Sequence, residues 1–171
     1  GFLGSSIMCG SQIDYFKESY RVIIIDLPGY GNSKKAQSKN NINEMARTVL
    51  DCLKEKNIDS FFLLGHSRGG MMVQEMTKLT GEKIDKLICY GTGVVGNIPG
   101  RFESMNESRN RLKKDGLDST AYRIAKTRFI EGNKSKYFNQ INILNKNIPN
   151  NELSIFKDCS QNVHLEKPEE F

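Results

Sequence analysis

The sequence predicts an α/β fold, in which a mostly parallel sheet is flanked by helices and followed by a small helical insertion. Apolar runs that end in turn-rich segments alternate with amphipathic helical segments, in the order strand, helix, strand, helix, strand. These apolar runs are continuous rather than alternating, which is typical of strands buried on both faces of a parallel sheet. With 171 residues, 37% hydrophobic and 26% charged, the chain is long enough for one such core.

The first predicted strand covers residues 22–25 and is closed by the turn-rich segment Asp26-Leu-Pro-Gly. A helix then begins after Asn41, because a capping side chain is followed by the acid Glu44 three residues on. The apolar stripe of this helix consists of Ala46, Val49, Leu50 and Leu53. These signals predict the first strand–helix unit of the sheet.

The second predicted strand covers residues 61–64, and a helix from about Arg68 to Leu79 follows it. A third strand is predicted over residues 87–90. The chain thus supplies three strands with two crossover helices, as a doubly covered parallel sheet requires.

After residue 100 the sequence changes character. Residues 102–114 and 119–130 read as two amphipathic helices separated by Asp115-Gly116. We therefore divide the chain into a core at residues 1–100, a helical insertion at 101–140 and a C-terminal part of the core at 141–171. The last part is predicted to hold a short strand in residues 151–158 and a closing helix that begins near His164.

The net charge of +5 is concentrated between Arg101 and Lys136, where ten basic residues face five acidic ones. The favoured interpretation is a solvated face of helices, because no nucleic-acid motif accompanies these charges. The four cysteines lack metal-ligand spacing, and no apolar run is long enough to span a bilayer. With no signal-peptide pattern at the start, we expect a cytoplasmic protein with reduced thiols, without metal, membrane or nucleic-acid partners.

The stretch Gly65-His66-Ser67-Arg68-Gly69 lies between a predicted strand and a predicted helix. Gly65 and Gly69 are expected to give a sharp turn the room it needs. Such a turn raises the Ser67 hydroxyl above the carboxyl edge of the sheet, while the helix N-terminus and the Arg68 N–H face any developing oxyanion. Ser67 is therefore the candidate nucleophile; the alternative is a glycine-rich turn with an incidental serine.

This Gly-x-Ser-x-Gly turn resembles the nucleophile elbow of the α/β hydrolases. The opening Gly1-Phe2-Leu3-Gly4 resembles the family's oxyanion loop, and residues 26–33 are similar to the loop after its next strand. The tail from residue 148 resembles its last strand, histidine loop and final helix. Overall, the sequence is most similar to enol-lactonase, MenH-like and carbon–carbon-bond hydrolases.

The resemblance implies that Ser67 is the nucleophile and that the backbone N–H groups of Phe2 and Arg68 form the oxyanion hole. It implies no organic cofactor and no metal, a small-molecule substrate, and a role for the insertion at residues 101–140 as the cap that shapes the pocket. Because this cap is basic, a carboxylate-bearing substrate is mildly preferred.

The catalytic base is the first difficulty. The family usually places its histidine in a Cys-Gly-His or Cys-Ala-His triplet, and here Cys159-Ser160-Gln161 occupies that place. Gln161 thus stands in the position of the catalytic histidine, and His164 matches a structural histidine further on. An amide cannot act as a general base, so the resemblance implies an impaired enzyme. A natural degenerate site and a deliberate substitution both explain Gln161, and His164 is the alternative base after a loop shift.

The triad acid is the second difficulty, because no matching strand-and-aspartate motif occurs. Among the downstream aspartates Asp115, Asp118 and Asp158, none lies in such a motif. We expect that the segment carrying the acid is missing from the sequence near Gln140-Ile141. A degenerate product, or a serine site without a standard triad, also fits.

The sequence therefore favours a serine hydrolase that acts on a small ester, lactone or activated carbon–carbon bond. The alternative of another class is a non-catalytic, ligand-binding member of the same fold, which Gln161 favours. A nucleic-acid binder that uses the basic insertion is a third hypothesis with little support.

Overall fold

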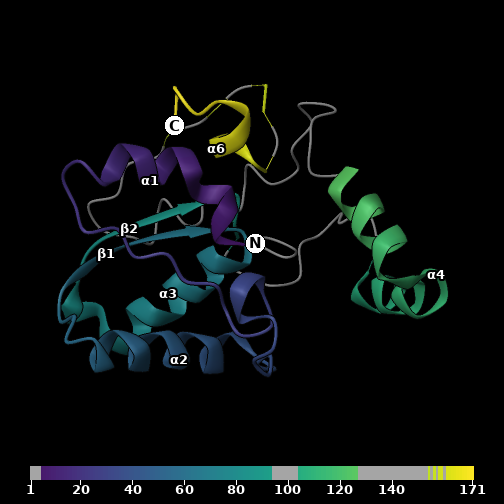
Figure 1. The fold of residues 1–171 in the computed structure, drawn as a ribbon, viewed down its shortest axis with the longest axis horizontal. Helices are drawn as coiled ribbons and strands as arrows, with labels where there is room; N and C mark the ends of the chain where they lie inside the picture. Colours follow the sequence, from purple (N-terminus) through teal and green to yellow (C-terminus); the bar gives the residue numbers. More distant parts are fainter. Residues whose placement is uncertain (1–4, 94–103, 127–153, 155, 157, 160) are drawn as a thin grey trace. The chain divides into compact units, whose positions relative to one another are not determined.

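The computed structural model describes residues 5–93, 104–126, 154, 156, 158–159 and 161–171 (Figure 1). The chain divides into two compact units, Gly1–Thr92 and Gly93–Phe171. The first unit holds the strands and the predicted serine turn, and the second holds the helical insertion and the C-terminal segment.

The sheet of the first unit consists of two parallel strands, β1 (Phe61–His66) and β2 (Ile84–Tyr90). Their register places Leu64 opposite Ile88, with one irregularity at the start of β1. Helix α3 (Arg68–Thr80) and the short 3-10 helix η3 (Gly81–Lys83) connect them. The two predicted strands and the helix between them are confirmed, and this strand–helix–strand unit carries the serine turn.

Helix α2 (Ile42–Glu55) begins where the capping signal predicts it. The Asn41 side-chain oxygen accepts a hydrogen bond from the Glu44 N–H at 2.8 Å. In return, the Glu44 carboxylate accepts from the Asn41 side-chain amide at 2.7 Å and from the Asn40 N–H at 3.4 Å. This reciprocal pairing satisfies backbone donors that the first turn of a helix leaves without partners.

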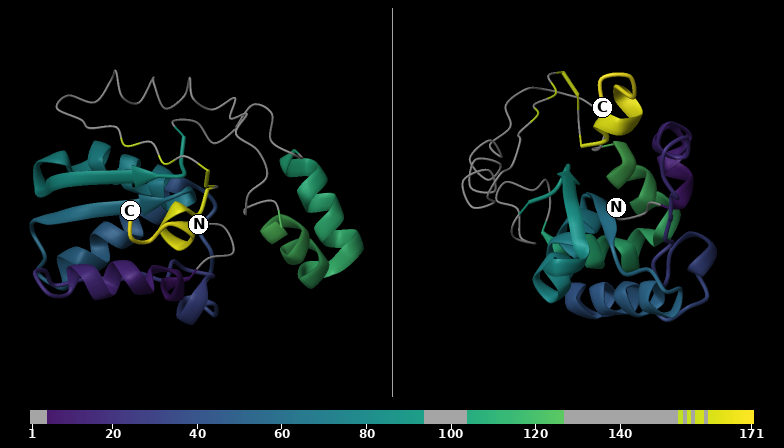
Figure 2. Two further views of the ribbon diagram at one scale, coloured as in Figure 1. Left: turned by 90° about the horizontal axis from the view of Figure 1, so that it is seen from above. Right: turned by 90° about the vertical axis from the view of Figure 1, so that its left-hand side faces the viewer.

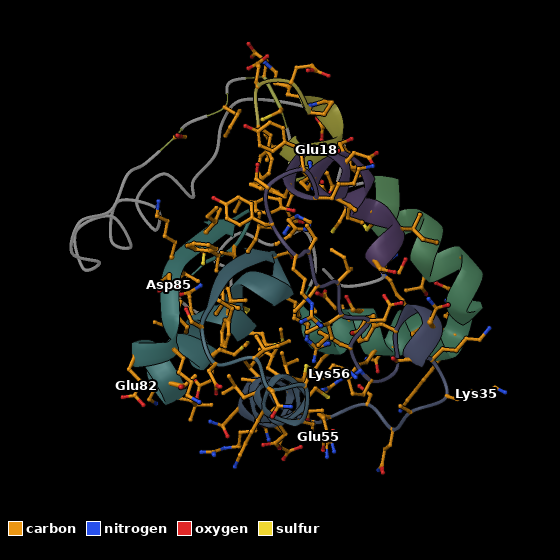
Figure 3. All side chains as sticks on the ribbon, turned by 60° about the vertical axis from the view of Figure 1, so that its left-hand side comes forward. Glu18, Lys35, Glu55, Lys56, Glu82 and Asp85 are labelled. Carbon is orange, nitrogen blue, oxygen red and sulfur yellow. The ribbon has the colours of Figure 1, made fainter. Side chains whose placement is uncertain are left out.

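The core of the first unit lies between α2, α3 and one face of the strands, and Figures 1 and 2 show both helices together on that face. Its buried members are Met45, Ala46, Val49, Leu53, Met72, Val73 and Met76. Charged side chains lie on the outside, as Figure 3 shows for Glu55, Lys56 and Glu82. The predicted apolar stripe of α2 is thus the face that packs on α3.

A segment to which no helix was assigned from the sequence lies on the opposite side of the strands, where Phe62 and Ile88 stay 50% and 44% exposed. It consists of the 3-10 helix η1 (Ser6–Cys9) and helix α1 (Gly10–Phe16), which lies above the strands in Figure 1. Just after α1, the Tyr20 ring meets the Phe62 ring edge to face, with centroids 5.5 Å apart. Because side chains alternate along a strand, Phe62 points away from the core, toward Tyr20, while Leu63 packs against the core.

The strand predicted at residues 22–25 is wrong: the structure assigns no strand there. Ile23, Ile24 and Ile25 are 39–42% exposed rather than buried on both faces. A strand exists only when a neighbour supplies its hydrogen bonds, and the sheet of the described residues contains only β1 and β2. The chain continues into a loop that contains the 3-10 helix η2 (Gly31–Ser33).

In the second unit, α4 (Met105–Lys126) spans most of the two predicted insertion helices, and residues 127–130 of the second lie outside the described residues. Gly116 interrupts it with φ 79° and ψ 175°, so the predicted break is confirmed. Ser104 and Glu107 form a reciprocal cap at its start. The closing helix is only α6 (Val163–Glu166), which ends before Pro168.

Most of residues 151–158, where a strand was predicted, lie outside the described residues. In the part of the chain that the structure describes, no helix has the length and apolarity needed to cross a membrane.

Candidate active site

Ser67 joins the end of β1 to the start of α3 and has an unusual backbone conformation, with φ 54° and ψ −118°. A residue other than glycine rarely adopts a positive φ, and such conformations cost about 1–3 kcal/mol. They persist where the surrounding structure fixes them, and they concentrate at functional sites. The strained serine is therefore the first structural mark of a site.

Hydrogen bonds hold this turn against the neighbouring strand. The Ser67 N–H donates to the Tyr90 carbonyl at the end of β2, at 3.0 Å, and the Ser67 carbonyl accepts from the Met71 N–H at 3.3 Å. The buried His66 ring stacks on the Tyr90 ring, with centroids 4.8 Å apart and planes 20° apart. His66 thus packs in the turn against β2.

Close packing around Gly65 and Gly70 explains the glycines of the turn. A Cβ atom on Gly65 would lie 2.7 Å from the Gly69 carbonyl oxygen and from the Gly70 Cα, which real contacts do not allow. A Cβ atom on Gly70 would lie 2.6 Å from the Cβ of Thr92. Nothing lies within 4 Å of the corresponding position on Gly69. The expectation that Gly69 provides clearance is wrong, because Gly70 is the residue at the close approach.

The N-terminus of α3 offers hydrogen-bond donors beside Ser67. The N–H groups of Arg68, Gly69 and Gly70 open the helix, so no acceptor precedes them within it. These groups also carry the positive end of the helix dipole, which favours negative charge. Of the two predicted oxyanion donors, Arg68 occupies this position, and Phe2 lies outside the described residues.

The loop at residues 26–33 is organised by the Asp26 carboxylate. It accepts hydrogen bonds from the Asn32 N–H at 2.9 Å, the Ser6 N–H at 2.8 Å and the Ser6 hydroxyl at 3.2 Å. These donors, first the Asn32 N–H, lower the pKa of Asp26. Gly31, at φ 47°, leaves room for the carboxylate that a side chain would occupy. Asp26 therefore ties the start of η1 to this loop.

The same loop contacts the first residue of α3. The Arg68 guanidinium Nη1 donates a hydrogen bond to the Tyr30 hydroxyl at 2.8 Å. Both residues are half-buried. This contact brings the side chain that follows Ser67 against the loop organised by Asp26, and nothing in the motif indicated it.

The candidate base residues belong to the second unit, so their roles remain predictions. Gln161 is half-buried in a turn just before α6. His164 lies within α6 and is 1% exposed, with its ring 6.2 Å from that of Phe171. Burial lowers the pKa of His164, so its neutral form prevails at neutral pH.

Among the residues that the structure describes, none of the three downstream aspartates is assigned as the acid of the site. Asp115 is exposed on α4, and Asp158 lies in a bend with φ 52°. The side chain of Asp118 lies outside the described part of the chain. Within the described ranges, no group of three or more His, Cys, Asp or Glu side chains is arranged to hold a metal ion.

Known proteins resemble this chain in sequence, including the turn around Ser67. The family model described as "alpha/beta hydrolase fold" matches residues 1–115. Esterase YbfF of Escherichia coli is 31% identical over 114 residues, which are 67% of this chain and 44% of the esterase. The (E)-2-((N-methylformamido)methylene)succinate hydrolase of Acinetobacter baylyi is 26% identical over 107 residues, which are 63% of this chain and 40% of that enzyme.

Among solved structures, the esterase EaEST from Exiguobacterium antarcticum has a similar fold, with a TM-score of 0.79. It is 16% identical, and the match covers 99% of this chain and 85% of that structure. The chain spans less than half the length of the curated relatives described above.

Proposed function

Because this chain belongs to the α/β hydrolase fold family, we propose that it is a serine hydrolase in which Ser67 attacks a small ester, a lactone or an activated carbon–carbon bond. The observation that carries the proposal is the strained conformation of Ser67, φ 54° and ψ −118°, between a parallel strand and a helix N-terminus. An incidental serine in a βα turn gives no reason for that strain.

In the proposed reaction, the Ser67 oxygen bonds to the substrate carbonyl carbon, and the hydroxyl proton passes to a base. The carbonyl oxygen gains negative charge, which the Arg68 N–H at the start of α3 stabilises, together with the Phe2 N–H by family resemblance. The leaving group departs with a proton, and water releases the acyl group from Ser67. Removing one oxyanion-hole donor costs about 10²–10³ in turnover in a serine protease.

The base limits this chemistry. Gln161, in the family position of the histidine, has a carboxamide that cannot accept the serine proton, and loss of a triad base costs up to about 10⁶ in turnover. His164 is the alternative, and its neutral form at neutral pH suits a base. Slow hydrolysis is therefore expected of this chain.

The names of the relatives support the proposed substrate class. One is an esterase, and the Acinetobacter relative acts on a compound that contains a succinate group. Together with the basic segment between Arg101 and Lys136, the latter favours a substrate that carries a carboxylate. The helical insertion at residues 101–140 is proposed to be the cap over this substrate.

A second function is favoured by Gln161 alone. If Ser67 has no base, the same fold remains able to bind a small ligand at the elbow without turning it over. This makes the chain a non-catalytic, ligand-binding member of the family.

Hydrolysis of 4-nitrophenyl acetate separates the two functions. We expect wild-type protein to release nitrophenol faster than Ser67→Ala, and Gln161→His to raise the rate by at least about 10²-fold. The exposed Arg47→Gln on α2 serves as a matched control and should leave the rate unchanged.

Equal rates for wild type and Ser67→Ala, with no gain from Gln161→His, would contradict the hydrolase and leave the ligand-binding function. A gain from Gln161→His that Ser67→Ala abolishes would identify position 161 as the site of the base.

A further inference from the structure

Arg68 directly follows the proposed nucleophile, but the proposed mechanism uses only its backbone N–H. Arg68 is half-buried, and its Nη1 donates to the Tyr30 hydroxyl at 2.8 Å. Tyr30 is itself fixed by its loop, since its N–H donates to the Leu27 carbonyl at 2.9 Å and its carbonyl accepts from the Ser33 N–H at 2.8 Å. The guanidinium is thus bound to a neutral hydroxyl from a loop whose backbone is itself hydrogen-bonded.

This guanidinium has no acidic partner among the described residues. The side chains of Lys17 and Lys83, in contrast, each pair with an aspartate at the surface. The acid of the Arg68–Tyr30 loop is Asp26, and its hydrogen bonds go to Ser6 and Asn32. A guanidinium is always charged and offers five donors in a planar fork, of which the described structure uses one.

A partly buried charge without a counter-ion is unfavourable unless another group compensates it. The planar fork of arginine matches a carboxylate, which it binds through two parallel hydrogen bonds. Because Arg68 directly follows Ser67 in the turn, a carboxylate of the molecule that binds at Ser67 is the candidate partner for this fork. An arginine whose side chain was merely exposed to solvent at the first turn of α3 would not affect which ester reacts.

We propose that the Arg68 guanidinium, positioned by the Tyr30 hydroxyl, binds a carboxylate of the substrate and makes this elbow selective for anionic esters. The inference rests on the proposed function, and it assigns the selectivity to one side chain of the elbow rather than to the charge of the insertion. Tyr30 acts through Arg68 and is a positioning residue.

Two substrates of equal length test the selectivity: the mono-4-nitrophenyl ester of adipic acid, which carries a carboxylate, and neutral 4-nitrophenyl hexanoate. The quantity measured is the ratio of their kcat/KM values. We expect Arg68→Gln to lower this ratio about tenfold or more, mainly through KM for the anionic ester. Arg68→Lys retains the charge without the fork and should lower the ratio less, and Tyr30→Phe should also lower it less than Arg68→Gln.

Arg47→Gln is the control, because it removes the same charge from the exposed face of α2. An unchanged ratio in Arg68→Gln, or an equal fall in Arg47→Gln, would overturn the proposal. The second result would assign the selectivity to overall charge.

Binding to Ser67→Ala protein keeps this test separate from catalysis. Calorimetry with monophenyl adipate should give a dissociation constant about tenfold higher when Arg68→Gln is added, and an unchanged one when Arg47→Gln is added. If the hydrolase proposal fails, this binding difference still decides the role of Arg68. Equal binding with and without the Arg68 guanidinium would refute it.

Discussion

Residues 22–25 and residues 61–64 are both continuous apolar runs that lead into turn-rich loops, yet only the second forms a strand. The difference is the neighbour: β1 pairs with β2, whereas residues 22–25 have no strand partner in the described sheet. The following loops differ as well. Close packing fixes the loop after β1, and hydrogen bonds to the Asp26 carboxylate fix the loop after residues 22–25.

Because the two loops are fixed by different interactions, they should respond differently to added side-chain volume, to loss of charge and to pH. A turn fixed by packing tolerates charge changes but no added volume, because Gly65 lies against the backbone of Gly69 and Gly70, and Gly70 lies against the Thr92 side chain. A turn fixed by a carboxylate tolerates small changes in volume but depends on that charge and on pH.

The largest expected effect is on the glycines of the packed turn. Gly65→Ala and Gly70→Ala should each lower the free energy of unfolding by about 3 kcal/mol, because the new methyl group meets backbone or the Thr92 side chain. Gly69→Ala is the matched control: it has open space and lies in a helix, so it should be neutral or stabilise by up to about 1 kcal/mol. Urea denaturation measures all three. Equal losses of unfolding free energy in Gly69→Ala and Gly70→Ala would contradict the explanation by close packing.

The next largest effect is expected when one side chain in each of the two apolar runs is truncated to alanine. Leu63→Ala should cost about 2 kcal/mol, because Leu63 packs against the core from β1. Ile24→Ala should cost less than about 1 kcal/mol, since Ile24 is 39% exposed and unpaired in the described sheet. The measurement is again the free energy of unfolding. A loss at Ile24 as large as that at Leu63 would show that residues 22–25 are buried in the folded protein.

The smallest effect concerns the carboxylate of the second loop. Asp26→Asn should lower the free energy of unfolding by about 1–2 kcal/mol at pH 7, because three donors lose a charged acceptor. Folding lowers the pKa of Asp26, so its stabilisation is present above the ordinary carboxyl value of about 4 and is lost as the pH falls through the lowered value. The difference in the free energy of unfolding between wild type and Asp26→Asn should therefore disappear at low pH.

Asp14→Asn is the control for this effect, because Asp14 forms only an exposed pair with Lys17 on α1. We expect it to change stability by less than about 0.5 kcal/mol at either pH. If the loss of unfolding free energy in Asp26→Asn stayed constant down to pH 3, the stabilisation could not come from the ionised Asp26 carboxylate.

Sequence alone predicted the features whose signals are local. The Asn41 cap, the strand–turn–helix around Ser67 and the break at Gly116 each depend on residues within a few positions of one another. The features that failed depend on distant partners. A strand at residues 22–25 needs a neighbour, and the role of Gly70 depends on Thr92, which is 22 positions away. Helix α1 was missed because a helix of 7 residues carries little periodicity.

The candidate site also contains one part that local sequence predicts and one part that depends on distant residues. The elbow follows from its own sequence, but the contact between Arg68 and Tyr30 joins residues 38 positions apart, which no local motif reveals. The assignments of Phe2, Gln161 and His164 still rest on family resemblance. Ser67, the proposed nucleophile, is therefore the residue of the site for which the sequence motif, the backbone strain and the family resemblance agree.

The measurement that tests this central claim most directly is covalent trapping of Ser67. A fluorophosphonate, which transfers its phosphorus to an activated serine oxygen with loss of fluoride, should add one group to the intact protein by mass spectrometry. The account predicts that peptide mapping finds this group on Ser67, and that Ser67→Ala protein stays unmodified. Modification of a different residue, or equal modification of Ser67→Ala, would contradict it.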